Sequence, residues 1–236
     1  MGARGLADLH VHTCFSDGRP TPTDVVEHVV ENTDLDVIAI TDHDTIEGAL
    51  RAAEYAAGRR RPHVIVGEEV SSRDGHIVGL FLSKRVRPGM SAAATIHAIK
   101  AQGGLAFAAH PFWRTERPRH PRKAVHGVGW LAADLDFDAL EVENATPGLY
   151  VFNQMARRLN ISAAKPELGN SDAHILEAIG RAYTDFPGRT PAALRRALES
   201  GKTRALRRRY DAVTLMRYAA WGLSRERAAA AALIGA

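Results

Sequence analysis

Short apolar runs alternate with amphipathic stretches along most of the chain. The apolar runs are rich in Val, Ile, Leu and Ala and have the length of buried β-strands; they cover residues 6–12, 37–41, 63–67, 76–82, 105–109 and 139–142, with a weaker run ending at 169–170. Stretches with helical periodicity lie between them, at 46–57, 91–102, 149–159 and 191–199 and in a first helix that Thr23 is expected to cap. Strict alternation of strands and helices predicts a parallel sheet.

The chain reads as one α/β domain. No long linker, low-complexity tract or clear internal repeat interrupts the 236 residues, a length that fits a single domain or a single α/β barrel. We expect this domain to cover residues 1–205. Residues 206–236 are rich in Ala and Arg and predict a helical tail that packs on the domain or extends it, without identifiable chemistry.

The composition is that of an ordinary globular protein, with 45% hydrophobic and 25% charged residues. No segment resembles a signal peptide or approaches the roughly 20 apolar residues of a membrane span, so we expect a cytoplasmic protein without a membrane partner. Cys14 is the only cysteine, which excludes an internal disulfide and a zinc cluster of thiolates. Any metal ion must therefore be held by histidines and carboxylates.

The net charge of +4 comes largely from arginines concentrated at 114–123 and 204–210. Such runs are either solvated surface or a recognition site for a phosphorylated substrate. The charge alone does not decide between the two.

Polar side chains with metal-binding capacity stand at the ends of the predicted strands. Because the carboxyl ends of parallel strands meet at one rim of a barrel, these residues should converge; they are His10, His12, Asp42, His43, Glu68, Glu69, His110, Glu143, Asn144, Asp172 and His174. His10 and His12 are two apart on a strand, so both imidazoles can face one ion. Imidazole and carboxylate together suit zinc, manganese or iron, and a carboxylate such as Glu68 can bridge two ions. His76 departs from the pattern because it begins a strand.

Five motifs in order, "DLHVHTCFSDG", "TDHDT", "GEEVS", "AHP" and "GNSDAH", resemble the motif set of the PHP family, named for its bacterial polymerase and histidinol phosphatase members. The resemblance runs from Asp8 to about Ser200. It implies a distorted seven-stranded, TIM-like (β/α) barrel with two or three divalent metal ions that hydrolyses phosphate esters.

The resemblance also implies a ligand set: His10, His12, Glu68 and Asp172 on a first ion, His76 and His110 on a second that Glu68 bridges, and Asp17, His43 and His174 on a third. Asp42 would orient His43. Many family members have histidine where this chain has Asp17, which leaves the identity and occupancy of the third ion open.

Several residues receive more specific roles. Glu68, Asp172 and His174 are the predicted catalytic residues, and Arg114, Asn144 and Arg181 the predicted contacts to substrate. The remaining histidines are predicted to be structural or on the surface; they are His28, His63, His97, His120 and His126.

The sequence thus predicts a metal-dependent hydrolase of phosphoric esters, in which a metal-bound hydroxide attacks a sugar phosphate, a nucleotide or an oligonucleotide. Three alternatives stay open. An amidohydrolase shares the HxH motif but commonly bridges its metals with a modified lysine, whereas a carboxylate stands at the expected position here. A nuclease acting on DNA or RNA ends would use the basic segments as its footprint. A metal-stabilised scaffold would have no activity.

Overall fold

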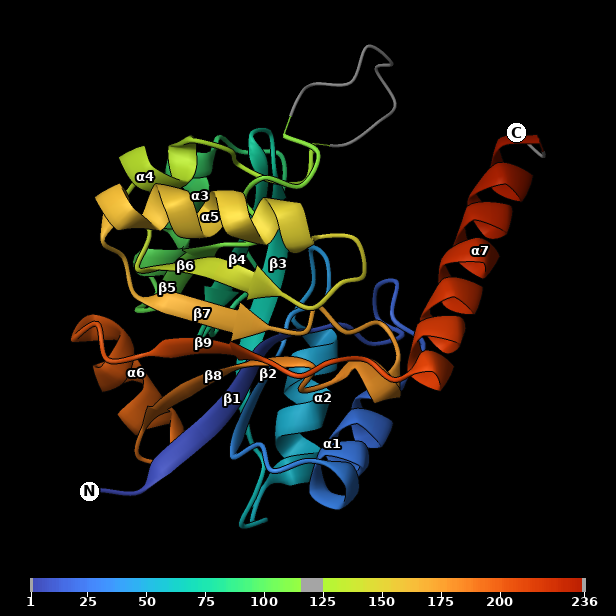
Figure 1. Cartoon of the computed structure of the whole chain (residues 1–236), viewed down its shortest axis with the longest axis horizontal. Helices are drawn as coiled ribbons and strands as arrows, with labels where there is room; N and C mark the ends of the chain where they lie inside the picture. The colour runs from blue at the N-terminus through green and yellow to red at the C-terminus, as the bar shows by residue number, and fades with distance from the viewer. Residues whose placement is uncertain (1, 116–124, 235–236) are drawn as a thin grey trace.

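Nine strands form one sheet that curls into a nearly closed barrel in the computed structural model, which describes residues 2–115 and 125–234, except the side chains of 225–234 (Figure 1). The strands follow the spatial order β7-β6-β5-β4-β3-β2-β1-β8-β9. Their bounds are β1 Arg4–Val11, β2 Val37–Ile40, β3 His63–Ser72, β4 Gly75–Leu80, β5 Leu105–Ala108, β6 Ala139–Asn144, β7 Glu167–Asn170, β8 Ala182–Pro187 and β9 Arg204–Arg207. The predicted distorted α/β barrel is confirmed.

The sheet is not wholly parallel, because β4 runs antiparallel to both β3 and β5. β3 turns directly into β4 through Arg73 and Asp74, without an intervening helix, so the predicted strict alternation is wrong at this point. The reversal brings the beginning of β4, and with it His76, to the rim where the parallel strands end. A residue that begins a strand can therefore join residues that end strands.

The first and seventh strands meet at this rim. Val11 forms a parallel bridge with Ala173, and the backbone N–H of His12 donates to the Ala173 carbonyl at 2.9 Å. The buried carboxylate of Asp8 accepts hydrogen bonds from the backbone N–H groups of Ser171 and Gly180. On the other side of β1, β8 extends the sheet antiparallel to β1, and β9 pairs antiparallel with β8. The sequence pattern predicted neither of these last two strands.

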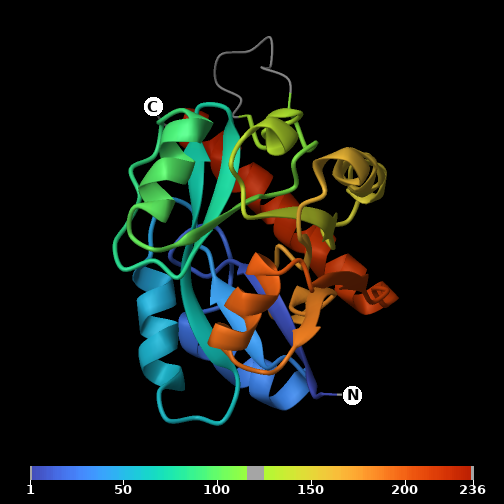
Figure 2. The ribbon, with the colours of Figure 1, turned by 90° about the vertical axis from the view of Figure 1, so that its left-hand side faces the viewer.

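Helices surround the sheet, with α2 and α3 on one flank and α5 on the other (Figure 2). Their bounds are α1 Pro22–Asn32, α2 Glu47–Ala56, α3 Ala92–Lys100, α4 Leu131–Asp134, α5 Tyr150–Ala163, α6 Pro191–Glu199 and α7 Ala212–Ile234, with a 3-10 turn, η1, at Leu176–Ala178. In the described part of the chain, no helix combines the length and the apolar character needed to cross a membrane.

The first helix begins two residues earlier than predicted. Thr21, not Thr23, is the N-cap: its hydroxyl accepts the backbone N–H of Asp24, whose carboxylate accepts the N–H of Thr21. Pro22 occupies the first helical position, where its fixed φ and missing N–H are tolerated. This capping box fixes the end of the connection that leaves β1.

Three apolar clusters bind the helices to the sheet. One joins the sheet to α3 and α5, a second joins it to α6, and a third joins it to α1, α2 and the first half of α7. Burial of a large aliphatic side chain stabilises a fold by about 1.5 to 3 kcal/mol, so these clusters supply a rigid base for the polar rim.

Candidate metal centre

Nine histidine and carboxylate side chains converge at the rim where the parallel strands end. Their possible ligand atoms fall into four overlapping groups, each with its atoms within 4.8 Å of one another: His12, Asp17, His43 and His174; His10, His110 and Asp172; His10, His12 and Glu69; and His43, Glu69 and His76. Eight of these nine residues were predicted as metal ligands from the sequence. The ninth is Glu69, which stands in the place given to Glu68.

Glu69 lies at the centre of the cluster. Its Oε2 atom is 3.2 Å from His10 Nε2, 3.3 Å from His12 Nε2 and 3.2 Å from His43 Nδ1. Its Oε1 atom is 2.8 Å from His76 Nδ1 and 3.0 Å from His110 Nε2. Each carboxylate oxygen thus faces its own set of imidazoles, which is the arrangement expected of a group that bridges two ions.

Glu68 lies outside the cluster, so the structure does not bring it to the position that its predicted bridging and catalytic roles require. Adjacent residues of a strand point to opposite faces of a sheet, so Glu68 and Glu69 cannot both face the rim. The Glu68 Oε2 atom accepts the backbone N–H of Val86 at 2.7 Å, and Arg85 lies 3.9 Å away. The "GEE" motif contains both glutamates, and only the orientation of β3 determines which of the two points to the rim.

A second part of the cluster is built on the turn that follows β1. Asp17 places Oδ1 at 3.0 Å from His174 Nε2 and Oδ2 at 3.7 Å from His43 Nε2. Asp42 stabilises this turn: its carboxylate accepts the backbone N–H and hydroxyl of Thr13 and the hydroxyl of Ser16, at 2.6 to 2.7 Å. The hydrogen bonds described for Asp42 go to Thr13 and Ser16, and none of them goes to His43. Asp42 therefore positions Asp17 through the backbone.

Glu141 on β6 is a site residue that the sequence analysis missed. Its Oε1 atom lies 3.1 Å from His10 Nδ1, and its Oε2 atom accepts the backbone N–H of His110 at 2.7 Å. A carboxylate on one ring nitrogen fixes the orientation of an imidazole and directs the other nitrogen to a metal. The signal was present as an acidic residue inside a predicted buried strand.

The three predicted substrate contacts lie in different environments. Asn144 is buried and donates to Asp172 Oδ2 at 3.2 Å, so it orients a candidate ligand. Arg181 donates to Asp211 and Thr214 at the start of α7, so its guanidinium is engaged with this helix. Arg114 is exposed on the loop after His110. The rest of the predicted basic segment, 116–123, with His120, lies outside the described residues.

His126 lies nearer to the cluster than the sequence suggested. Its ring centroid is 4.8 Å from that of His76, and its backbone N–H donates to the Arg114 carbonyl at 3.3 Å. Burial, together with the neighbouring His76 and His110, lowers the pKa of His126 to about 3. A neutral imidazole therefore stands between the cluster and the Arg114 loop.

The carboxylates of the cluster carry negative charge, which favours the binding of cations. Burial by itself would raise the pKa of Glu69, but the imidazoles of His43, His76 and His10 hold it well below its ordinary value. Burial opposes a charge on His12 as well, yet Asp172, Glu69 and Asp17 raise its pKa to about 10. Burial lowers the pKa of His43 to about 4. The carboxylates are thus ionised and hold protons on the central imidazoles.

Two candidate ligands adopt left-handed backbone conformations. His110 has φ 27° and Asp172 has φ 52°. Such conformations are uncommon for residues other than glycine, and they concentrate at functional sites where the surrounding structure enforces them.

The donor set fits divalent metal ions. Among the described residues, the buried ring nitrogens His10 Nε2, His12 Nε2 and His110 Nδ1 have no hydrogen-bond partner. The His10 and His12 Nε2 atoms face ionised carboxylates but do not have the geometry of a hydrogen bond to them. A metal ion between the nitrogens and the carboxylates would give these buried nitrogen atoms a partner. Imidazole and carboxylate ligands without thiolates suit zinc, manganese or iron.

Two family models match the chain: the PHP domain over residues 8–125 and the PHP-associated model over residues 151–203. An uncharacterised protein of Methanocaldococcus jannaschii is 34% identical over 150 residues, 59% of this chain and 81% of that protein. A 3',5'-nucleoside bisphosphate phosphatase of Chromobacterium violaceum is 43% identical over 77 residues, 31% of this chain and 26% of that protein.

Among solved structures, a two-domain protein of Bacteroides vulgatus, containing a predicted PHP-like metal-dependent phosphoesterase, superposes with a TM-score of 0.69 at 21% identity. The superposition covers 88% of this chain and 66% of that one, and it shows a shared fold. The family models cover both the strands that carry the candidate ligands and the segment that contains β7. The chain therefore belongs to the PHP family.

Proposed function

We propose that this protein is a metal-dependent phosphoesterase that hydrolyses a phosphate ester of a small molecule, such as a sugar phosphate or a nucleotide. The observation that carries the proposal is the position of Glu69, whose two carboxylate oxygens face separate sets of imidazoles. A shared carboxylate between two ion positions is suited to a phosphate, whose attacking and leaving oxygens both need charge neutralisation.

The ion positions follow the ligand set that the family resemblance implies, with Glu69 in the place of Glu68, and the distances between the ligand atoms support them. His10, His12, Glu69 and Asp172 would hold one ion, and Glu69, His76 and His110 a second. Asp17, His43 and His174 would hold a third. When bound, divalent ions lower the pKa of coordinated water from 15.7 toward about 7 and neutralise charge on phosphoryl oxygens.

The other residues of the site orient these groups and bind the substrate. Glu141 directs His10 Nε2 toward the cluster, and Asn144 holds Asp172 by a hydrogen bond. The exposed guanidinium of Arg114 offers paired donors that match phosphate oxygens and is assigned to substrate binding.

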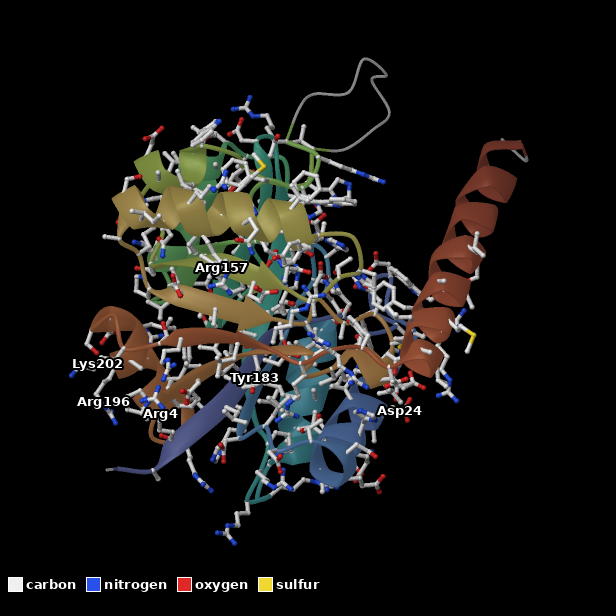
Figure 3. The ribbon with its side chains drawn as sticks, viewed as in Figure 1. Arg4, Asp24, Arg157, Tyr183, Arg196 and Lys202 are labelled. Atoms are coloured by element: carbon white, nitrogen blue, oxygen red, sulfur yellow. The ribbon has the colours of Figure 1, made fainter. Side chains whose placement is uncertain are left out.

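Among the described residues, the charge distribution agrees better with a small substrate than with a nucleic acid. Arg207 pairs with Glu143 at 3.2 Å, and Arg208 lies over the ring of Tyr183, so both are engaged with the protein. Arg4, Arg196 and Lys202 lie at the end of the molecule away from the rim (Figure 3). The similarity to a nucleoside bisphosphate phosphatase supports the same class of substrate. The carboxylate of Glu69 at the bridging position favours a phosphoesterase over an amidohydrolase.

The test compares Glu69→Gln with Glu68→Gln, two isosteric changes at adjacent positions of β3. Metal content and phosphate release from sugar phosphates, nucleotides and short oligonucleotides are measured on Mn²⁺-loaded protein. We expect Glu69→Gln to lose bound metal and to lower turnover by at least about 100 fold, in the range typical of lost metal-ligand and electrostatic contacts. Glu68→Gln should retain both.

Other outcomes separate the alternatives. Equal metal content and turnover in Glu69→Gln and the unmodified protein would contradict the bridging role. Cleavage of oligonucleotides alone would indicate a nuclease, and bound metal without hydrolysis of any substrate would indicate a scaffold.

A further inference from the structure

The helix α7 lies beyond residue 203, the last residue that either family model matches, yet it contacts the metal-bearing rim. The arrows of β6 and β7 point toward the side of the molecule on which α7 stands (Figure 1). Thr214, Tyr218 and Trp221 are spaced four and three residues apart and are the buried side chains of its first half, with exposed fractions of 3, 7 and 9%. This face of α7 therefore packs on the rim.

Trp221 joins two candidate ligands that belong to different loops. Its indole ring lies against the imidazole of His174, with centroids 4.4 Å apart. Its indole N–H donates to the backbone carbonyl of Asp17 at 3.2 Å. Asp17 Oδ1 is in turn 3.0 Å from His174 Nε2, so Trp221 contacts both residues of this pair.

Tyr218 makes a parallel set of contacts one turn earlier. Its hydroxyl donates to the Asp172 carbonyl at 3.5 Å and lies 3.4 Å from the hydroxyl of Thr146, which donates to Asp172 Oδ2 at 3.3 Å. The loops that follow β1, β6 and β7 thus all touch one face of α7.

The helix has anchors that do not depend on these aromatic residues. Arg181 pairs with Asp211 at 2.9 Å, Arg217 pairs with Glu177, and Arg19 donates to the Ser224 hydroxyl at 3.1 Å. A substitution of Trp221 should therefore leave α7 in place.

We propose that Trp221 is a positioning residue for the third ion position, formed by Asp17, His43 and His174. Asp17 sits on a turn rather than on a strand. Asp42 supports this turn at Thr13 and Ser16, and Trp221 supports the backbone carbonyl of Asp17 itself while its ring fixes the plane of the His174 ring. Groups that orient ligands in this way typically change metal affinity by about 10 to 100 fold when removed. The proposal rests on the proposed function, because it assumes that the cluster binds metal ions.

The test is calorimetric titration of the full-length, metal-free protein with Mn²⁺. We compare Trp221→Ala and Trp221→Phe with Trp130→Phe, a control at a position that is 66% exposed and packs on Phe112. Trp221→Ala should weaken binding of one ion by about 10 to 100 fold and leave the remaining ions unchanged. Trp221→Phe keeps a ring against His174 but loses the N–H, so its loss should be smaller. Trp130→Phe should bind like the unmodified protein.

Indole fluorescence adds a readout that is independent of activity. Mn²⁺ bound beside His174 should quench Trp221, and this phase should disappear in Trp221→Phe but persist in Trp130→Phe. Circular dichroism of the metal-free variants checks that they are folded. If Trp221→Ala does not fold, the metal affinities of Trp221→Phe test the proposal.

Three results would overturn the proposal. Unchanged affinities in both Trp221 variants would show that the contacts do not act on metal binding. Equal weakening of every ion would indicate a general structural role. Absence of Mn²⁺ binding by the unmodified protein would overturn the proposed function and this inference together, whereas the first two results leave the proposed function intact.

Discussion

Two adjacent glutamates of β3 experience opposite environments. Glu69 faces five imidazoles, which hold its pKa well below the ordinary value against the effect of burial. Glu68 is equally buried but has one backbone donor, Val86, and its pKa rises from 4.5 to about 7 through burial. The same residue type is therefore a charged centre at one position and a proton-binding group at the next.

This difference predicts a pH-dependent effect of Glu68→Gln on stability. Because the folded-state pKa is raised, the Glu68 proton contributes stability that is complete below pH 4.5 and is lost as the pH rises through about 7. Glutamine stays neutral and can still accept the Val86 N–H. The free energy of unfolding of Glu68→Gln, relative to that of the unmodified protein, should rise by on the order of 1 to 3 kcal/mol between pH 4.5 and pH 8. Urea unfolding at both pH values measures it, and a constant difference would contradict the buried, proton-binding Glu68.

At Arg114 the prediction concerns substrate binding. Its guanidinium lies over the ring of Trp113 and is exposed on the loop after His110. A charge-assisted hydrogen bond to phosphate is worth about 1.5 to 3 kcal/mol. Arg114→Ala should therefore lower kcat/KM by roughly 10 to 150 fold, with metal content unchanged. Steady-state kinetics on the best substrate of the phosphate-release screen tests this, and a change below about twofold would make Arg114 a solvated surface residue.

At the scale of elements, the connection from β1 to α1 carries Asp17 and is fixed at both ends. Asp42 holds its first turn, and the Thr21 capping box holds its last. The two ends should have separable effects. Asp42→Ala should destabilise the protein by about 1 to 3 kcal/mol and also weaken Mn²⁺ binding, because it releases the Asp17 turn.

Thr21→Ala is the matched control for this prediction. It removes one cap from the same connection and should cost about 1 kcal/mol while metal affinity stays unchanged. Thermal unfolding and Mn²⁺ titration of both variants give the comparison. Similar losses of metal affinity in the two variants would show that the whole connection, rather than the Asp42 contacts, positions Asp17.

The same scale explains which parts of the fold the sequence predicts. The buried runs that become β1 to β7 are apolar and bounded by turn residues, and their periodicity identifies them. The last two strands are not recognised from the sequence. β9 has only four residues, "RALR", with an arginine at each end, and its strand conformation depends on pairing with β8. The reversed direction of β4 depends on a turn of two residues and on packing. The hydrophobic pattern of the sequence does not predict the direction of a strand.

The candidate site is predictable to a similar depth. Histidines at strand ends are visible in the sequence, whereas the choice of Glu69 over Glu68 depends on which face of β3 turns inward. Glu141 and Trp221 act through contacts with residues 131 and 204 positions away, at His10 and Asp17. Only the folded chain brings such pairs together.

At the scale of the whole molecule, metal binding should be coupled to proton release. Carboxylates raise the pKa of His12 to about 10, and an imidazole must lose its proton before it can coordinate an ion. Mn²⁺ binding at pH 7 should therefore release protons, and affinity should fall as the pH is lowered. Calorimetry in buffers of different ionisation enthalpy measures the number released. The same observed enthalpy in all buffers would show that His12 is already neutral.

The meeting of β1 and β7 at the rim has a consequence for the topology of the chain. Leu9 and Asn170 are hydrogen-bonded across 161 residues, and the candidate ligands His10 and Asp172 lie directly beyond them. An ion bound by both ligands would cross-link these distant segments, and closing so long a loop would remove much of the conformational freedom of the unfolded chain. A ribosome-bound chain in which residues 170–174 have not yet been synthesised cannot form this cross-link. The first ion position can therefore assemble only after almost the entire barrel has been synthesised.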